Sequence, residues 1–121
     1  MLKKIIKSFP YAVHGIIYSL QTQVNFRFHI TAAVLALLLS FYLRISAVEF
    51  LFICNAIFLV LTAELINTAV EKTVDLCTRE ICPLAQVAKN VAAGAVLTAA
   101  LFSLITGMVI FIPKLFVLWR L

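Results

Sequence analysis

The sequence predicts an all-α integral membrane protein with three transmembrane helices and an amphipathic, interfacial helix at its N-terminal end. Of the 121 residues, 64% are hydrophobic and 12% are charged, whereas soluble domains typically have about 45–50% apolar and about 25% charged residues. The mean hydropathy is +1.13. The length fits a single domain, residues 1–121, and one soluble domain of this size could not bury so much apolar surface. Part of that surface is therefore expected to face lipid.

Three apolar segments approach or exceed the length of about 20 residues that a helix needs to cross a bilayer. They cover about residues 28–45, 47–70 and 91–112, and Pro113 with Lys114 is expected to stop the third. The connection between the first two segments is very short, so these helices are expected to form an antiparallel pair. Between the second and third segments lies a polar stretch, residues 71–90.

The N-terminal segment, residues 1–24, is too polar to span a membrane. Its apolar side chains recur at helical spacing between Lys3, Lys4, Lys7 and several polar residues, which indicates a helix lying on the membrane surface. Pro10 is expected to kink or interrupt it. An ordinary interfacial anchor explains the same pattern.

The distribution of basic residues predicts the orientation in the membrane. The net charge is +5, and seven of the ten Lys and Arg residues lie either before residue 28 or between residues 71 and 90. Because basic residues favour the cytoplasmic side, the N-terminus and the 71–90 segment are expected in the cytoplasm. In so apolar a chain the positive charge favours a membrane surface over nucleic acid as its partner.

Cysteine and histidine offer little for metal binding or redox chemistry. There are three Cys and two His, and the separation of Cys77 from Cys82 matches neither a zinc site nor a Cys-x-x-Cys motif. We expect reduced thiols. In the third span, Ala95, Ala99, Ser103 and Gly107 form a stripe of small residues that lets helices approach closely. That stripe serves packing either within one chain or between copies in a homo-oligomer.

Four polar residues at the end of the second span need a functional or structural reason. Glu64, Asn67, Glu71 and Asp75 follow one another at steps of three, four and four, so they share one face of a helix. Ionisable groups within a span are costly and are usually functional. The stripe is either a polar seam that sets helix register or a cation site. In the first case its partners would come from Lys72, Arg27 or Lys89.

The depth of these carboxylates points to phosphoryl transfer. A carboxylate in a low-dielectric environment is suited to accept a proton, and a shallower one is suited to Mg²⁺, which prefers oxygen ligands. Glu64 fits the first role and Glu71 the second, and Lys89 could meet a phosphate at the same level. Base, metal and lysine are the parts of a phosphoryl-transfer site. The sequence has no glycine-rich phosphate loop, so a soluble kinase fold is excluded.

Two segments carry a family resemblance: Glu64-Leu-Ile-Asn67-Thr-Ala-Val-Glu71-Lys-Thr-Val-Asp75 and the stretch from Ala88 to Leu97. Together with Lys4, Tyr11, Gly15 and residues 25–29, they resemble the prokaryotic diacylglycerol kinase and undecaprenol kinase family over essentially the whole chain. The resemblance implies a homotrimer in the bacterial inner or plasma membrane. It also implies transfer of the ATP γ-phosphate to a lipid hydroxyl at the cytoplasmic face, with Mg²⁺ as cofactor.

The resemblance also implies roles for individual residues. Glu64 would be the catalytic base, and Glu71 with Gln23 would bind the metal. The nucleotide-binding positions would be Lys4, Tyr11, Gln23, Glu71, Glu80, Ile81, Cys82, Lys89 and Asn90. The lipid-binding positions would be Asn25, Arg27, His29, Glu64 and Asn67, and the form of residues 25–29 resembles the undecaprenol branch more than the diacylglycerol branch.

Three positions depart from the family pattern. Gln23 and Asn90 stand where the family usually has carboxylates, and Cys82 stands where it usually has His. An amide oxygen can coordinate Mg²⁺ but supplies no negative charge, so weaker metal–nucleotide binding and reduced activity are expected. The leading hypothesis is a lipid kinase acting on undecaprenol or diacylglycerol. The alternatives are an impaired relative that only binds nucleotide or lipid, and a small ion-conducting or structural membrane subunit.

Overall fold

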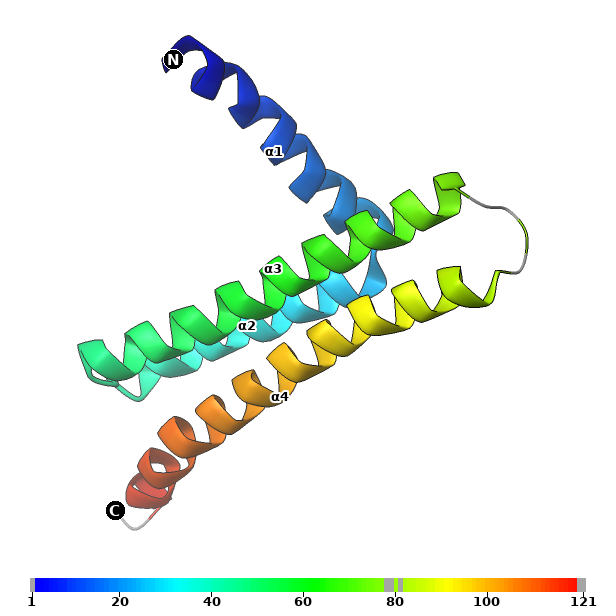
Figure 1. Cartoon of the computed structure of the whole chain (residues 1–121). Helices are drawn as coiled ribbons and strands as arrows, with labels where there is room; N and C mark the ends of the chain where they lie inside the picture. Colours follow the sequence, from blue (N-terminus) through cyan, green and yellow to red (C-terminus); the bar gives the residue numbers. More distant parts are fainter. Residues whose placement is uncertain (1, 78–79, 81, 120–121) are drawn as a thin grey trace.

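The computed structural model describes residues 2–77, 80 and 82–119, which form four helices and no strand. These are α1 (Leu2–Thr22), α2 (Val24–Tyr42), α3 (Ala47–Cys77) and α4 (Pro83–Trp119). Helices α2, α3 and α4 lie side by side along their length, and α1 projects away from them at an angle (Figure 1). Helices α2, α3 and α4 are each long and apolar enough to cross a membrane. The predicted all-α membrane fold is confirmed.

The segment predicted as a polar connection, residues 71–90, is mostly helical. Helix α3 has 31 residues and α4 has 37, so at 1.5 Å per residue both exceed the ~30 Å hydrocarbon core of a bilayer. This stretch has no glycine to break a helix, and Pro83 stands at the first position of α4, where its missing N–H costs nothing. The two helices therefore carry the polar residues beyond the apolar core on rigid backbone.

Neither Pro10, which was expected to kink or interrupt its helix, nor Pro113, which was expected to stop its helix, ends the helix that contains it. Pro113 lies within α4, which continues to Trp119, and Pro10 lies within α1. A proline removes one backbone hydrogen bond. In an apolar environment the neighbouring peptide groups still gain most by remaining helical. The prediction that Pro113 stops the third helix is therefore wrong.

The antiparallel α2–α3 pair is built on a tight turn at residues 43–46. The N–H of Ile45 donates to the carbonyl of Ser40 and the N–H of Arg44 to that of Phe41, the pattern of a Schellman C-cap. Arg44 takes the left-handed conformation that this cap requires, with φ 48°. Ser46 and Glu49 then cap each other's backbone N–H at the start of α3, at 3.3 and 2.7 Å.

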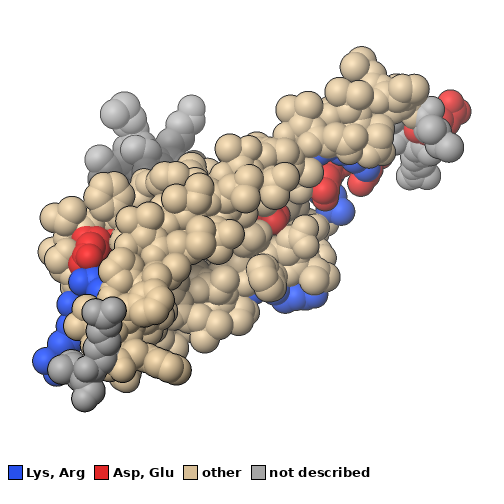
Figure 2. Space-filling view, turned by 90° about the horizontal axis from the view of Figure 1, so that it is seen from below, with Lys and Arg blue, Asp and Glu red and all other residues tan. Residues whose placement is uncertain are grey.

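Helix α3 is the centre of the packing. Helix α4 runs along it, α2 packs on it as well, and α1 contacts α2 and α3 less extensively. The small buried core lies on these faces, at Phe26, Ile53, Ala56, Val60, Ala99 and Ile110. Most other large apolar side chains are exposed. In Figure 2 one group of charged side chains lies at one end of the long axis and the others lie in the opposite half, with few charged side chains visible between them.

Candidate functional site

The polar residues of α3 form a gradient of burial along one face of the helix. Glu64 is 2% exposed and Asn67 is 8% exposed, Glu71 is half-buried, and Asp75 is exposed. The order matches the predicted change in depth from the span toward the interface. Since a buried carboxylate is costly unless it has partners, the neighbours of Glu64 decide its role.

The neighbour of Glu64 comes from α2. The Nε2 atom of His29 lies 3.4 Å from Oε1 of Glu64, and the His29 side chain keeps 20% of its surface exposed. On α3 itself, the Thr68 hydroxyl donates to the Glu64 carbonyl at 2.9 Å. The site thus pairs a buried carboxylate with an imidazole that reaches partly to the surface.

Asn67 connects this buried end to Glu71. Its Nδ2 donates to Oε1 of Glu71 at 3.1 Å. Its Oδ1 is buried and accepts no hydrogen bond from the part of the chain that the structure describes. An unsatisfied buried acceptor costs about 1–3 kcal/mol, so this oxygen favours an incoming donor such as a hydroxyl group.

An ion pair joins the shallow end of the stripe to α4. Lys89 Nζ lies 2.6 Å from Oδ1 of Asp75, which makes Lys89 a partner of the polar face, as the seam interpretation allowed. Arg27 instead donates to the carbonyls of Leu20 and Gln21, at 3.5 and 3.0 Å. Within α4, Gln86 Nε2 donates a hydrogen bond to Oδ1 of Asn90, one turn further along, at 2.9 Å.

Two more predicted site residues, Gln23 and Asn25, lie at the junction of α1 with α2. Gln23 precedes α2 as its N-cap residue and is half-buried, and its Nε2 donates to the Thr22 hydroxyl at 3.1 Å. Asn25 is exposed in the first turn of α2. A hollow of about 440 Å³ lies between α1 and α3 near this junction and is lined in part by Ser19, Thr68 and Lys72.

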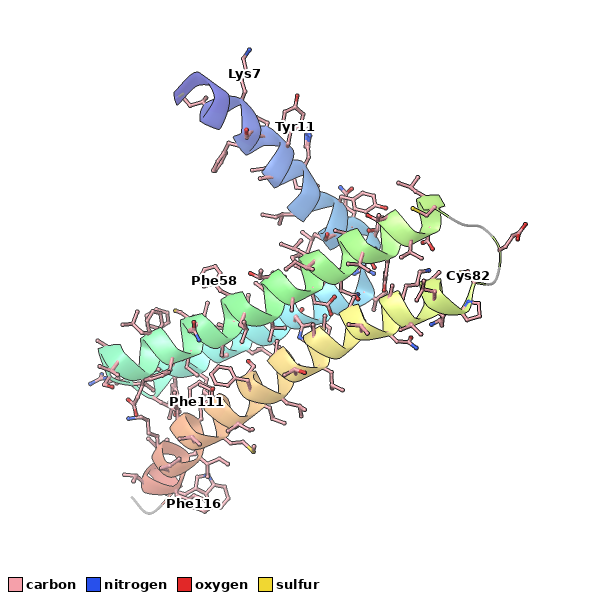
Figure 3. All side chains as sticks on the ribbon, in the orientation of Figure 1. Lys7, Tyr11, Phe58, Cys82, Phe111 and Phe116 are labelled. Atoms are coloured by element: carbon pink, nitrogen blue, oxygen red, sulfur yellow. The ribbon has the colours of Figure 1, made fainter. Side chains whose placement is uncertain are left out.

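The outlying predicted nucleotide positions are not gathered around Glu71 in the single chain. Tyr11 is 78% exposed and projects from the part of α1 that stands clear of the bundle, far from Cys82 (Figure 3). Glu80 and Cys82 are exposed. The side chain of Lys4 and all of Ile81 lie outside the described residues.

The donors present fit a metal ion that arrives with phosphates. Among the described residues, no cluster of three or more His, Cys, Asp or Glu side chains could hold a metal. Mg²⁺ is commonly bound by one or two carboxylates together with substrate phosphates. The half-buried Glu71 carboxylate meets that requirement and does not form an all-protein cage.

Sequence reasoning missed the contacts that depend on helix pairing. Thr68 and Ser19 are buried polar residues that no motif singled out, although Thr68 follows Glu64 by one helical turn. The sequence carried no signal for the approach of His29 to Glu64. It offered Lys89 as one of three possible partners of the polar face, without indicating that Lys89 pairs with Asp75. Both depend on how far one helix is shifted along its neighbour.

Comparison with known proteins gives a consistent assignment. The sequence model described as prokaryotic diacylglycerol kinase matches residues 10–111. An undecaprenol kinase of Bacillus subtilis (strain 168) is 44% identical over 114 residues, covering 94% of this chain and 93% of that protein. A diacylglycerol kinase of Synechocystis is 38% identical over 92% of this chain and 64% of its own length. A diacylglycerol kinase of Escherichia coli (strain K12) is 28% identical, covering 88% of this chain and 88% of that protein.

Three apolar helices that are each long enough to cross a membrane, with a buried carboxylate on the central one, are the features of a multi-pass membrane protein. The chain belongs to the prokaryotic diacylglycerol kinase family and is a lipid kinase.

Proposed function

We propose that this chain transfers the γ-phosphate of ATP to the hydroxyl of undecaprenol at the cytoplasmic face of the bacterial inner or plasma membrane. The similarity to an undecaprenol kinase, at 44% identity over nearly the full length of both chains, supports this acceptor over diacylglycerol. The two diacylglycerol kinases described above are 38% and 28% identical. Family membership favours the kinase over an ion-conducting or structural subunit.

The observation that carries the proposed chemistry is the placement of Glu64. This carboxylate is almost wholly buried, has an imidazole nitrogen 3.4 Å away, and stands one turn from the unpaired oxygen of Asn67. In the proposed step Glu64 takes the proton of the lipid hydroxyl while Asn67 Oδ1 orients that hydroxyl. The hydroxyl oxygen forms a bond to the γ-phosphorus, the bond to the β,γ-bridging oxygen breaks, and ADP leaves.

Phosphate binding is assigned to the shallower residues. Glu71 and Gln23 would hold Mg²⁺, which when bound neutralises phosphate charge. Lys89 has three N–H donors, so it can keep Asp75 and still donate to a phosphate oxygen. Tyr11, Asn90, Lys4 and the segment from Glu80 to Cys82 stay predicted nucleotide contacts, and Asn25 and Arg27 stay predicted lipid contacts.

Transfer from γ-labelled ATP in mixed lipid–detergent micelles with Mg²⁺ tests this function, with undecaprenol and diacylglycerol offered separately. We expect the wild-type chain to label undecaprenol. Glu64→Gln should reduce turnover by at least a thousandfold, consistent with loss of a general base, while ATP binding stays within a few-fold.

Glu49→Gln is the matched control, because it makes the same chemical change in the first turn of α3, about four turns before Glu64. The amide oxygen that it introduces can still accept the hydrogen bond from the Ser46 N–H. This variant should retain transfer. Loss of ATP binding in Glu64→Gln would place Glu64 among the phosphate or metal ligands instead. Labelling of neither lipid by the wild type would refute the proposed function.

A further inference from the structure

The proposed transfer leaves a proton in a closed site. As the lipid hydroxyl forms its bond to the γ-phosphorus, its proton passes to Glu64, and the carboxylate becomes a neutral carboxyl group. Glu64 must lose that proton before it can serve as a base again. Because Glu64 is only 2% exposed, its carboxyl group has almost no contact with solvent, so a neighbouring group is needed to carry the proton out.

His29 is the basic side chain that stands next to this carboxyl group. Its Nε2 lies 3.4 Å from Oε1 of Glu64. Lys89 pairs with Asp75 instead, at 2.6 Å, and Arg27 donates to backbone carbonyls at the end of α1. Among the basic side chains that the structure describes, only His29 lies within ion-pairing distance of Glu64.

The polar neighbours on α3 are unsuited to receive the proton. The Thr68 hydroxyl donates to the backbone carbonyl of Glu64, and Asn67 donates to Glu71. Hydroxyl and amide groups are not bases near neutral pH, whereas an imidazole gains and loses a proton in that range. His29 is therefore the neighbour with the chemistry to take it.

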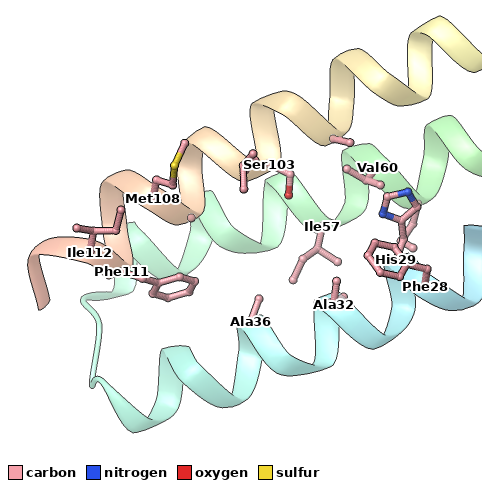
Figure 4. A pocket seen from close by; sticks show the side chains of 15 residues that line it. Phe28, His29, Ala32, Ala36, Ile57, Val60, Ser103, Met108, Phe111 and Ile112 are labelled. Carbon is pink, nitrogen blue, oxygen red and sulfur yellow. The ribbon is translucent and has the colours of Figure 1, made fainter. Parts of the chain in front are cut away.

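His29 also reaches the outside of the protein. Its side chain keeps 20% of its surface exposed, against 3% for that of Glu64. In Figure 4 it stands at the end of an apolar groove between α2 and α4, whose other lining residues have no titratable side chain. Along α2 it follows the exposed Arg27 by two residues, or ~3 Å at 1.5 Å per residue. It thus lies close to the level at which the polar end of the helix begins.

We propose that His29 takes the proton from Glu64 after each transfer and passes it to water at the membrane surface. This inference rests on the proposed function and adds how the site returns to its starting state. The carboxyl group of Glu64 gives its proton to Nε2 of the neutral imidazole, which leaves a carboxylate and an imidazolium. The imidazolium then releases a proton to water from its exposed edge, and the ring is neutral again. Carboxylate and histidine side chains form proton relays of this kind within membranes.

The relay is needed between turnovers and not for the first one, which separates it from a positioning role. His29→Gln keeps a side chain that can donate to Glu64 but cannot accept its proton. Rapid-quench measurement of transfer from γ-labelled ATP to saturating undecaprenol gives both rates. We expect a first turnover within about threefold of the wild type and a steady-state rate lower by about tenfold or more.

His14→Gln is the matched control. His14 is the other histidine of the chain and is exposed on α1, so the same chemical change there should leave both rates unaffected. A retained first turnover in His29→Gln shows that the variant is folded.

Added imidazole tests the chemistry of the relay in a second variant. His29→Ala removes the ring and leaves room for a small molecule beside Glu64. Imidazole should raise the steady-state rate of His29→Ala by about tenfold. Pyrrole, which has the same five-membered ring without a basic nitrogen, should not. His29→Gln, whose side chain occupies the space, should respond to neither.

Four results would overturn the proposal, and they can be told apart. Unchanged steady-state rates in both variants would show that the proton leaves by another route, such as the product phosphate. A first turnover slowed as much as the steady state would make His29 a positioning residue or a lipid contact. Equal rescue by pyrrole would reduce its role to packing. If the wild type labels no lipid, the proposed function fails first and the relay fails with it.

Discussion

Position 64 shows how one residue depends on its neighbours across helices. A carboxylate with 2% exposure in a membrane helix is tolerated only where polar partners surround it. Here the partner of the carboxylate is His29 from α2. Thr68 bonds the backbone carbonyl of Glu64, and Asn67, one turn on, donates to Glu71. Because the free oxygen of Asn67 is the buried acceptor left without a partner among the described residues, the site is chemically prepared for a hydroxyl donor.

The side-chain amides of Gln23 and Asn90 are expected to limit activity, because they stand near the predicted metal–nucleotide position and carry no charge. Gln23→Glu combined with Asn90→Asp adds two negative charges near the predicted metal–nucleotide position. A charge-assisted contact is worth about 1.5–3 kcal/mol, so we expect at least a tenfold lower Mg²⁺ concentration at half-maximal rate. The hydrogen bond that Asn90 accepts from Gln86 can be kept by a carboxylate.

Titration of the transfer rate with Mg²⁺ at fixed ATP measures this effect. Gln21→Glu, an exposed residue near the end of α1, controls for the added charge alone and should not shift the curve. An unchanged Mg²⁺ requirement in the double variant would show that positions 23 and 90 do not contribute to metal–nucleotide binding.

At the scale of elements, the turn at residues 43–46 sets the alignment of α2 with α3. The Schellman cap ends α2 and the reciprocal cap of Ser46 and Glu49 begins α3. Glu49 also pairs with Lys114 of α4 at 3.2 Å, so this end of the bundle is tied together across three helices. The alignment matters for function because it brings His29 opposite Glu64.

Removal of the α3 N-cap should weaken that alignment. Ser46→Ala deletes the hydroxyl that accepts the Glu49 N–H and should lower the free energy of unfolding by about 1 kcal/mol. Thermal unfolding followed by circular dichroism in detergent micelles measures the loss. Ser46→Thr keeps the hydroxyl and should unfold close to the wild type. Equal midpoints for the alanine variant and the wild type would contradict a stabilising cap.

For the whole molecule, the single chain leaves much of its predicted site open. Tyr11, Glu80 and Cys82 are exposed, and large apolar side chains such as Phe58 cover the outer faces of the helices. Lipid can cover the apolar faces, but it cannot complete a nucleotide site. In the stripe of small residues on α4, Ala99 is buried and Ala95 is exposed and available to another copy. Ser103 and Gly107 line an apolar groove between α2 and α4 (Figure 4).

The open positions favour an oligomer, and on the family resemblance we predict that the functional unit is a homotrimer. Light scattering of the detergent-solubilised protein, corrected for detergent, should give the mass of three chains of 13.5 kDa. The chain denatured in sodium dodecyl sulfate gives the reference mass of one copy. A monomer that retains full transfer activity would show that each site is complete within one chain.

The sequence alone determined the class of fold and the line of polar residues. Composition and hydropathy are local quantities, so the three spans follow from them, and helical periodicity places Glu64, Asn67, Glu71 and Asp75 on one face. Helix ends were less predictable, because Pro113 signals a break that α4 overrides. The polar residues 71–90 signal a connection, yet α3 extends to Cys77 and α4 already begins at Pro83.

The tertiary structure decided which residues from different helices meet. The contact of His29 with Glu64, the ion pair of Lys89 with Asp75, and the groove between α2 and α4 all depend on the relative shift and rotation of packed helices. That register results from the summed packing of many side chains and from turns such as the one at Arg44. A pattern read along one chain carries no information on the register, so these features emerge only from the folded molecule.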